Sequence, residues 1–411
     1  MVKIKILNYG SCNIDYVYAL DHILKVGETL VADKLNVFPG GKGLNQSIAI
    51  ARAGADVCHA GCVGTDGDFL LELMSDAGVD ISFVKRTNGK NGHAVIQVSQ
   101  EGENSIFIYA GSNGMIEQAD VDMVLSNFSE GDILLLQNEI NNIDYIIEKA
   151  HSVGMDIILN PSPINENILK LDFNMISYII RNEIEAGDIS GCGDPYDSLD
   201  FFKKEYPALK VMLTLGKNGC IYQERDTRIS HPIFETVAVD TTAAGDTFTG
   251  YFIAGLAAGL DTAEILRLAS CAAAISVSRH GAAPSIPTRD EVLNLIKNMS
   301  VKKSGIREEN TVRKIEFYIK NNIKNASLGG LADLLCYSAV YSGNVVKKLM
   351  GMSFNELLQK KRLELAASLL IETDEPIGDI ISKVGYENGS YFRRIFKERY
   401  GVNPFEYRKM R

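Results

Sequence analysis

Apolar runs that end in polar residues recur along the first 300 positions, and they constrain the fold more than any other feature. Four of these runs have the length of a strand and are separated by helical segments: 132–139, 157–161, 176–183 and 211–216. An apolar run without alternation indicates a strand that is buried on both faces, as in a parallel sheet covered by helices. The sequence therefore predicts an α/β domain on a parallel sheet, with ligands at the carboxyl ends of its strands.

Residues 92–109 follow a different pattern, because apolar and polar side chains alternate there. The alternation covers two runs, which are separated by the polar stretch 100–104. Two alternating runs around a short polar stretch predict a β-hairpin. Within an α/β chain, we interpret this hairpin as a small β lid over a site.

Small residues fill the stretch Asp240–Phe248, which follows an apolar run at 236–239 that we interpret as a strand. An apolar helical run begins at Phe248. The first N–H groups of a helix are unpaired and electropositive, so small residues there let an anion approach. A carboxylate in this turn, Asp246, would suit a general base that takes a proton from an alcohol attacking phosphorus. From this stretch alone, an Ala-rich helix start capped by Asp246 is as well supported.

Two stretches before residue 50 also have the composition of ligand-binding segments. Asn13 and Asp15 lie in a predicted loop after the strand Lys5–Tyr9, and they would face one side if the chain is extended. Such a pair suits sugar hydroxyls, although an Asx turn explains it equally. Phe38–Gln46 places three glycines around Lys42, which permits close approach of a ligand, but its spacing is not that of a Walker A loop.

Charge divides the chain into an acidic body and a basic end. Residues 305–411 carry 18 Lys and Arg and 13 Asp and Glu, whereas the preceding residues carry 24 and 39 of these. With 411 residues, the chain is long enough for two or three domains. This asymmetry indicates two parts with different partners, and nucleic acid is the expected partner of the basic part.

No run approaches the length of a membrane span, and we interpret Met1–Ile6 as a short strand and not as a signal peptide. The seven cysteines are scattered. Cys58 and Cys62 are four apart, but no second pair has the spacing of zinc ligands. We therefore expect reduced thiols in a cytoplasmic, bacterial protein without a membrane partner.

Seven motifs in the first 300 residues, taken together and in order, resemble the PfkB family of carbohydrate kinases, and its ribokinase-like members most of all. The motifs are residues 10–15, 40–46, 102–104, 136–139, 182–185, 214–219 and 240–250. One departure is Ala244, where many members have Gly, a change that ribokinases share. In Gly191–Pro195 we find no motif.

The resemblance implies a role for each motif. The residues expected to bind the sugar are Asn13, Asp15, Gly41, Lys42, Gly43, Asn45, Glu139 and Asp246. Those expected along the nucleotide are Asn182, Glu185, Thr214, Leu215, Gly216, Lys217, Asn218, Gly219, Gly245 and Ser270. Asn182 and Glu185 match an N-x-x-E element linked to Mg²⁺, while Ala243, Ala244 and Gly245 would form an anion hole beside Asp246, the catalytic base. A monovalent cation such as K⁺ would be held by Asp240, Thr242, Ser276, Arg279, Gly281 and Ser285.

The last hundred residues are predicted to be helical after a short polar linker, 300–306. A helix over 377–384, a turn at 385–386 and a basic helix over 390–400 follow the helix-turn-helix layout, whose second helix enters the major groove of DNA. The DNA-contacting side chains would be Ser390, Tyr391, Arg393, Arg394 and Lys397.

This region resembles the DNA-binding domain of the AraC/XylS family, which has two such motifs. The resemblance is strong over 377–408 and weaker in the first motif. There, Gly329 and Gly330 replace helix-forming residues, Ser342 and Val346 stand where larger apolar residues are usual, and Gly343 is expected to interrupt the recognition helix. DNA binding is therefore expected from the second motif, while the first remains open.

The sequence thus predicts a kinase domain over 1–299, a linker over 300–306 and a DNA-binding domain over 307–411. The expected activity is ATP-dependent phosphorylation of ribose or a related pentose at a primary hydroxyl, coupled to sequence-specific binding of double-stranded DNA by a homodimer. Two alternatives stay open: a transcription factor whose kinase fold only senses a sugar, and a nucleoside kinase.

Overall fold

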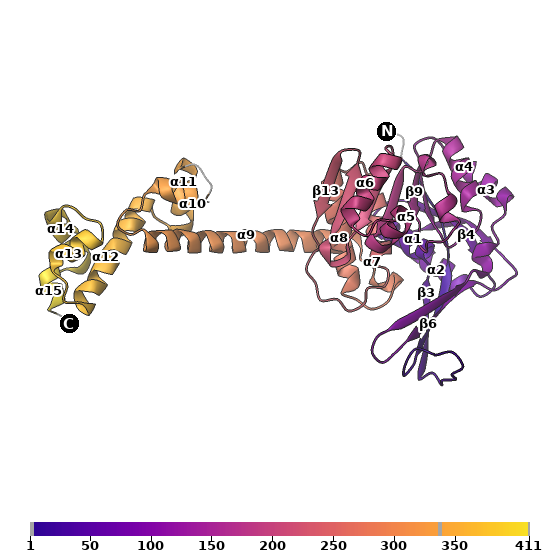
Figure 1. Cartoon of the computed structure of the whole chain (residues 1–411), viewed down its shortest axis with the longest axis horizontal. Helices are drawn as coiled ribbons and strands as arrows, with labels where there is room; N and C mark the ends of the chain where they lie inside the picture. Colours follow the sequence, from indigo (N-terminus) through magenta and orange to yellow (C-terminus); the bar gives the residue numbers. More distant parts are fainter. Residues whose placement is uncertain (1–3, 336–338, 410–411) are drawn as a thin grey trace. The chain divides into compact units, whose positions relative to one another are not determined.

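The computed structural model describes residues 4–335 and 339–409. The chain divides into two compact units, Met1–Ile296 and Lys297–Arg411, and we describe each by itself. Figure 1 shows the first unit as strands covered by helices and the second as helices alone.

A nine-stranded sheet forms the centre of the first unit, in the order β13-β12-β11-β10-β9-β8-β1-β4-β5. The strands are β1 (Ile6–Tyr9), β4 (Val57–Val63), β5 (Asp80–Arg86), β8 (Ile133–Gln137), β9 (Asp156–Asn160), β10 (Tyr178–Asn182), β11 (Lys210–Thr214), β12 (Cys220–Glu224) and β13 (Thr227–His231). Neighbours from β5 to β11 pair in parallel, whereas β12 and β13 are antiparallel additions at one edge. The four apolar runs thus form β8 to β11, as the pattern predicts.

Each face of the sheet has its own core, because alternate residues of a strand point to opposite faces. Leu135 of β8 packs in one core, and Leu134 and Leu136 pack in the other. The first core includes residues of α1 (Lys42–Arg52), α2 (Asp68–Asp76), α7 (Ala244–Ala257) and α8 (Thr262–Val277). The second includes residues of α3 (Gln118–Leu125), α4 (Ile143–Val153), α5 (Glu183–Ser190) and α6 (Pro195–Glu205). The doubly covered parallel sheet is confirmed.

A second sheet of four strands, in the order β3-β2-β6-β7, extends from this unit (Figure 1). Its strands are β2 (Asn13–Ala19), β3 (Lys34–Gly40), β6 (Gly92–Val98) and β7 (Asn104–Tyr109). The predicted hairpin is present, since β6 and β7 pair antiparallel. The prediction of a loop at Asn13 and Asp15 is wrong, because β2 pairs with β3 on one side and with β6 on the other from Asn13 onward.

One expectation about the 236–248 stretch is also wrong, because residues 236–239 form no strand. The N–H of Val239 instead donates to the Val277 carbonyl (2.7 Å). The following helix begins at Ala244, ahead of the apolar run at Phe248, and Asp246 lies in the first turn of α7, as the sequence predicts. Good helix-forming residues such as Ala extend the helix toward its N-terminus beyond the apolar run.

The second unit consists of helices α9 (Arg289–Asn321), α10 (Leu328–Leu335), α11 (Ala339–Met350), α12 (Phe354–Glu372), α13 (Ile377–Lys383), α14 (Gly389–Tyr400) and α15 (Pro404–Arg408), the first of which starts in unit one. Residues 300–306, the predicted linker, are helical and lie within α9. The predicted interruption at Gly343 is wrong, because α11 continues through it. Within the described residues, no helix is both long and apolar enough to cross a membrane.

Candidate active site and DNA-binding helices

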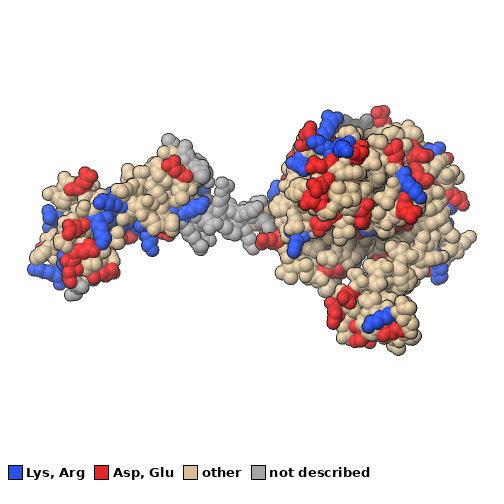
Figure 2. Space-filling model, viewed as in Figure 1, with Lys and Arg blue, Asp and Glu red and all other residues tan. Residues whose placement is uncertain are grey.

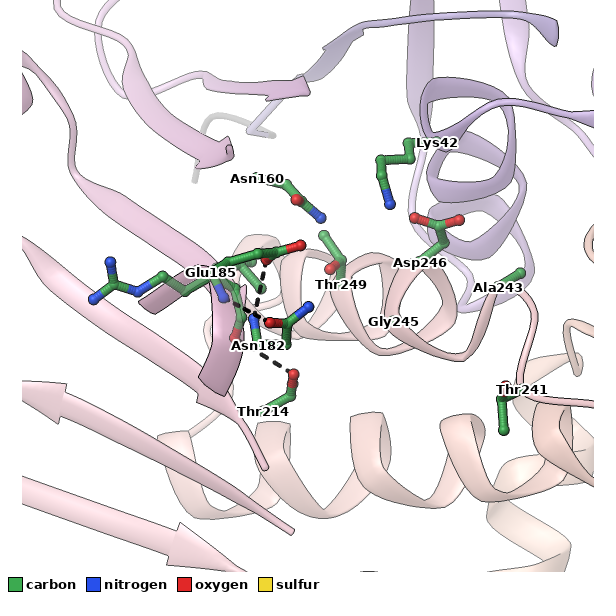
Figure 3. Close-up of a pocket in the computed structure, with 12 residues that line it drawn as sticks. Lys42, Asn160, Asn182, Glu185, Thr214, Thr241, Ala243, Gly245, Asp246 and Thr249 are labelled. Carbon is green, nitrogen blue, oxygen red and sulfur yellow. Dashed lines mark hydrogen bonds between the residues drawn. The ribbon is translucent and has the colours of Figure 1, made fainter. Parts of the chain in front are cut away.

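A cavity of about 220 Å³ lies where the carboxyl ends of β10 and β11 approach the start of α7. Its lining consists of Lys42, Asn160, Ile180, Arg181, Asn182, Glu185, Thr214, Thr241, Ala243, Gly245, Asp246 and Thr249. In Figure 3, Lys42 and Asp246 lie on one side of this cavity, and Asn182, Glu185 and Thr214 lie on the other. Parallel strands place ligand sites at this edge, as the sequence predicts.

Asp246 is buried at the N-terminal end of α7, with 7% of its surface exposed. Its two carboxylate oxygens accept hydrogen bonds from the side-chain amides of Asn45 (3.0 Å) and Gln46 (2.8 Å). Among the described residues, none accepts a hydrogen bond from the backbone N–H of Gly245 or Asp246. Ala243, the residue before the helix, has φ 59°, a left-handed conformation that L-residues seldom adopt. The Asp246 carboxyl group and unpaired backbone donors of the described residues thus share one helix start.

Asp15 and Glu139 complete a group of carboxylates with Asp246. Burial, followed by the charges of Glu139 and Asp246, raises the pKa of Asp15 to about 7. Burial also raises the pKa of Glu139, against the lowering effect of Lys42 and Ser11. The charges of Glu139 and Asp246 thus act on Asp15, and that of Asp246 acts on Glu139, although Asp15 comes from the lid strand β2 and Glu139 follows β8.

Lys42 balances this negative charge. Burial alone would lower the pKa of Lys42, but the carboxylates of Asp246, Glu139 and Glu185 outweigh burial and raise it. The Lys42 backbone N–H also donates to Glu139 Oε2 (3.0 Å), and the Ser11 hydroxyl donates to the same oxygen (2.5 Å). Glu139 therefore ties the glycine-rich segment at the start of α1 to the end of β8.

Asn182 and Glu185 cap the start of α5 reciprocally. The Glu185 N–H donates to Asn182 Oδ1 (2.9 Å), and the Asn182 N–H donates to Glu185 Oε2 (3.1 Å). Both line the cavity with Asp246. The second carboxylate oxygen of Glu185, Oε1, is outside this cap and is a hard ligand of the kind that Mg²⁺ prefers. Mg²⁺ needs few protein ligands when it keeps waters and phosphate oxygens.

A second cavity of about 460 Å³ adjoins the first, and Thr214, Thr241 and Gly245 line both. Of the residues predicted along the nucleotide, it also contains Gly216, Lys217, Gly219 and Ser270. Leu215 and Asn218 do not line it. Its apolar walls, which no motif in the sequence predicts, are formed by Ile233, Phe234, Ala238, Phe248, Ala273, Ala274 and Val277. An apolar slot next to a polar cavity suits a flat base attached to phosphates.

Five of the six residues predicted to hold a monovalent cation form two hydrogen-bonded groups. The Asp240 carboxylate accepts from the N–H of Thr242 and of Gly281, at 2.9 Å each. Ser276 and Ser285 share a hydrogen bond between their hydroxyls (2.8 Å). Arg279 instead pairs its guanidinium with Glu291 (2.5 Å). These contacts bring the chain segments of the predicted cation site together.

Several polar residues around the cavity were not predicted from the sequence. Asn160 and Thr249 line it directly, and Gln137 and Asn8 lie behind Asp246 in a buried network. Arg181 is 2% exposed and stacks on the Phe202 ring, 3.6 Å from its centre. Burial lowers the pKa of Arg181 to about 9. A polar residue within an apolar strand run could have indicated these positions, because a buried polar group requires a hydrogen-bond partner.

The helix-turn-helix formed by α13 and α14 presents its predicted DNA-contacting side chains to solvent. All five of them, Ser390, Tyr391, Arg393, Arg394 and Lys397, are exposed, while Phe392, Ile395 and Phe396 are buried in the core of this motif. The Arg394 guanidinium lies over the Tyr391 ring, 5.4 Å from its centre. On the face of this unit seen in Figure 2, basic side chains occur among acidic ones. Helix α14 therefore offers a polar face suited to a DNA groove.

Comparison with known proteins places both units. A family model described as "pfkB family carbohydrate kinase" matches residues 3–289, and one described as "Helix-turn-helix domain" matches residues 331–410. The ribokinase of Bacillus subtilis (strain 168) is 36% identical over 292 residues, which are 70% of this chain and 97% of that protein. The crystal structure of ribokinase from Cryptococcus neoformans var. grubii serotype A in complex with ADP is 31% identical, with a TM-score of 0.64, and the match covers 71% of this chain and 99% of that one.

The fold and these matches define the class: the chain belongs to the pfkB family of carbohydrate kinases and is an ATP-dependent carbohydrate kinase. Within the family it is similar to ribokinases. These include the Arabidopsis thaliana enzyme whose structure was solved with ribose and ATP, at 29% identity and a TM-score of 0.64 over 72% of this chain and 99% of that one. The helix-turn-helix match confirms the expected second domain.

Proposed function

We propose that this kinase transfers the terminal phosphoryl group of ATP to the primary hydroxyl of ribose or a closely related pentose, with Asp246 as the general base. One observation carries the proposal: the Asp246 carboxylate lies at an uncapped helix start, within electrostatic reach of Asp15, Glu139 and Lys42. Ribokinases at 33–36% identity support the choice of a pentose.

In this mechanism each group has one task. Asp15 and Asn13, on lid strand β2, form hydrogen bonds with sugar hydroxyls. The other residues that contact the sugar are Gly41, Gly43, Asn45 and Glu139. Asp246 takes the proton of the hydroxyl as that oxygen attacks phosphorus. The free N–H groups at the start of α7 and the Lys42 ammonium stabilise the charge on the transferred group. Positioning of this kind supplies most of the rate in phosphoryl transfer.

The residues present also fit the expected cofactors. Asn182 and Glu185 would hold Mg²⁺ through its waters and phosphate oxygens, and bound Mg²⁺ supplies charge neutralisation at the phosphates. The nucleotide base would lie in the second cavity, whose lining includes Phe234 and Ala274. Asp240 and Ser285 form hydrogen bonds with the backbone of the segments around the predicted cation site. Carbonyl oxygens of these segments would bind K⁺, and the bound ion would fix the loop before α7.

A coupled ADP-release assay against a panel of pentoses, hexoses and nucleosides tests the proposal. We expect turnover with ribose or a near relative and a fall in kcat of about 10²–10⁴ in Asp246→Asn. The matched control is Asp261→Asn, which changes a helix-capping carboxylate at the start of the neighbouring helix α8, outside both cavities. Asn caps helices as well as Asp does, so this control should keep wild-type turnover.

The same panel separates the alternatives. Turnover with nucleosides alone would make the protein a nucleoside kinase. If no compound is turned over while sugars still raise the unfolding temperature, the kinase fold acts as a sugar sensor and the proposed reaction is wrong.

We further propose that sugar and nucleotide occupancy change the affinity of the second unit for a specific DNA site. Support comes from the covalent arrangement, since α9 starts at Arg289, four residues after Ser285 of the predicted cation site, and continues to Asn321 without a break. The full chain, used to select DNA fragments from its own genome, should bind the selected site with a different Kd when ribose and a non-hydrolysable ATP analogue are present. An unchanged Kd would refute the coupling.

A homodimer formed through the lid completes the proposal. The strand β7 exposes Ile106, Phe107, Ile108 and Tyr109 by 47–58%, so both faces of this edge strand carry apolar surface. Apolar edge strands are stable in water when a partner covers them. Light scattering on the full chain should give twice the chain mass, and Phe107→Lys should reduce it; a monomeric wild type would exclude this dimer.

A further inference from the structure

A chain of buried polar side chains lies directly behind Asp246. It runs through Gln46, Gln137, Asn8, Ser47 and His59, and all five are 0% exposed. These residues come from α1 and from three neighbouring strands of the sheet, β8, β1 and β4. Burying this many polar groups is costly unless every partner is in place, so the arrangement requires a reason.

The chemistry of the end groups fixes the direction of every hydrogen bond. An ionised Asp246 can only accept, so the Gln46 amide nitrogen must face it (2.8 Å). The Gln46 oxygen then accepts from Gln137 Nε2 (2.8 Å), and that same nitrogen also donates to Asn8 Oδ1 (2.9 Å). Both hydrogens of the Gln137 amide are therefore used, and neither amide can flip without losing a bond.

The far end of the chain is consistent with this direction. Asn8 Nδ2 donates to the Ser47 hydroxyl (2.8 Å) and to the Gly43 carbonyl (2.8 Å). Since Ser47 accepts from Asn8, its own hydrogen points to His59 Nδ1 (2.8 Å). Burial lowers the pKa of His59 to about 4, so the ring is neutral and this nitrogen can accept.

From this geometry we infer that Gln46 is a positioning residue for Asp246: the buried chain locks its amide with the N–H directed at the carboxylate, which sets the rotamer and the ionised state of the base. Asn45 holds the other oxygen (3.0 Å), but its own carbonyl oxygen is buried without a partner among the described residues. The Asn45 amide is therefore fixed on one side only, whereas the Gln46 amide is fixed on both. This inference rests on the proposed role of Asp246 as the base.

The first test is Gln46→Met, which keeps the length of the side chain and removes the donor. We expect kcat to fall at least tenfold with a smaller change in the sugar KM. The acidic limb of the kcat/KM profile should move to higher pH by about one pH unit, the size of one hydrogen bond to an ionised group. The matched control is Gln223→Met: Gln223 is also buried, donates to the Leu199 carbonyl (2.7 Å) and lies on β12 outside both cavities.

A purely structural role for Gln46 predicts that both glutamine variants lose stability and that neither pH profile moves. If the wild type turns sugar over and Gln46→Met keeps the wild-type profile, the positioning role is wrong and the proposed reaction stands.

A second measurement does not depend on activity. A double-mutant cycle between Gln46→Met and Asp246→Ala, read as unfolding equilibrium constants at pH 8, should be non-additive by about tenfold, while the cycle between Gln223→Met and Asp246→Ala should be additive. Additivity in the first cycle overturns the inference, whether or not any sugar is a substrate.

Discussion

Asp15 is a sugar-binding candidate whose charge the folded protein disfavours when no ligand is present. It lies partly buried near Glu139 and Asp246, and its carboxylate accepts no hydrogen bond from the described residues. Burial and the two like charges raise its pKa from 3.8 to about 7. Such a carboxylate is stabilised only when donors arrive, and sugar hydroxyls are donors.

This shift has a defined effect on stability. A carboxyl group with a higher pKa in the folded chain than in the unfolded chain contributes stability that is fully present below pH 3.8 and is lost as the pH rises through about 7. At 1.36 kcal/mol per pH unit, the full loss is about 4 kcal/mol. Because Asp15 keeps part of its surface in solvent, we expect about 1–3 kcal/mol to be measurable.

Replacing Asp15 with Asn removes the charge and retains the shape. We therefore expect Asp15→Asn to be more stable than wild type at pH 8 by about 1–3 kcal/mol, and at pH 5 by roughly a third of that margin, because the unfolded carboxyl group is already ionised at pH 5. The variant should also bind ribose more weakly, since it loses a charged acceptor. The measurements are urea unfolding of the first unit, followed by far-ultraviolet circular dichroism at both pH values, and calorimetric titration with ribose.

Asp33→Asn is the matched control, because Asp33 is an exposed carboxylate just before β3 of the same sheet. Its stability relative to wild type should be the same at pH 5 and pH 8. If Asp15→Asn is no more stable than wild type at pH 8, then the carboxyl groups do not repel one another as the geometry indicates, and the reasoning about this cluster is refuted.

Three further predictions concern packing, cation and DNA. In Gly250→Ala, the new Cβ would press on the Ala49 side chain and lie 2.9 Å from the Ala49 carbonyl carbon, so the free energy of unfolding in urea should fall by about 1–3 kcal/mol. Gly193→Ala, in open space, should change this free energy little, and equal stabilities of the two variants would contradict the α1–α7 contact. Asp240→Ala should abolish any increase in kcat when K⁺ replaces tetramethylammonium at constant ionic strength, and a retained increase would place the cation elsewhere. Arg393→Ala should weaken DNA binding, measured by fluorescence anisotropy, and should reduce the slope of log Kd against log salt concentration by about one. An unchanged slope would show that this side chain does not contact DNA phosphate.

Much of the fold could be predicted because its signals are local. Continuous apolar runs identified β8 to β11, and alternation identified the β6–β7 hairpin. The errors fell where neighbours outside the local segment decide the outcome. Asn13 and Asp15 are in a strand because β3 and β6 pair with it on both sides, and 236–239 form no strand because none of the described strands pairs with them.

The candidate site was predictable to a similar degree. Asp246, Lys42, Asn182, Glu185 and Thr214 were expected from their motifs, and they line one cavity. The apolar walls of the second cavity were not expected, because side chains such as Phe234 and Val277 have the composition of any core. Only their position beside Gly245 makes them part of a site.

By itself, the sequence determined the α/β class, the acidic body with a basic helical end, and the residue types needed for phosphoryl transfer, because hydrophobic period, charge and short motifs are properties of neighbouring residues. The tertiary structure alone decided which polar groups meet. Gln46 and Gln137 are 91 positions apart, and Gln46 and Asp246 are 200 apart. They touch because α1 packs both over β8 and on α7, and such pairings depend on the folding of the whole chain.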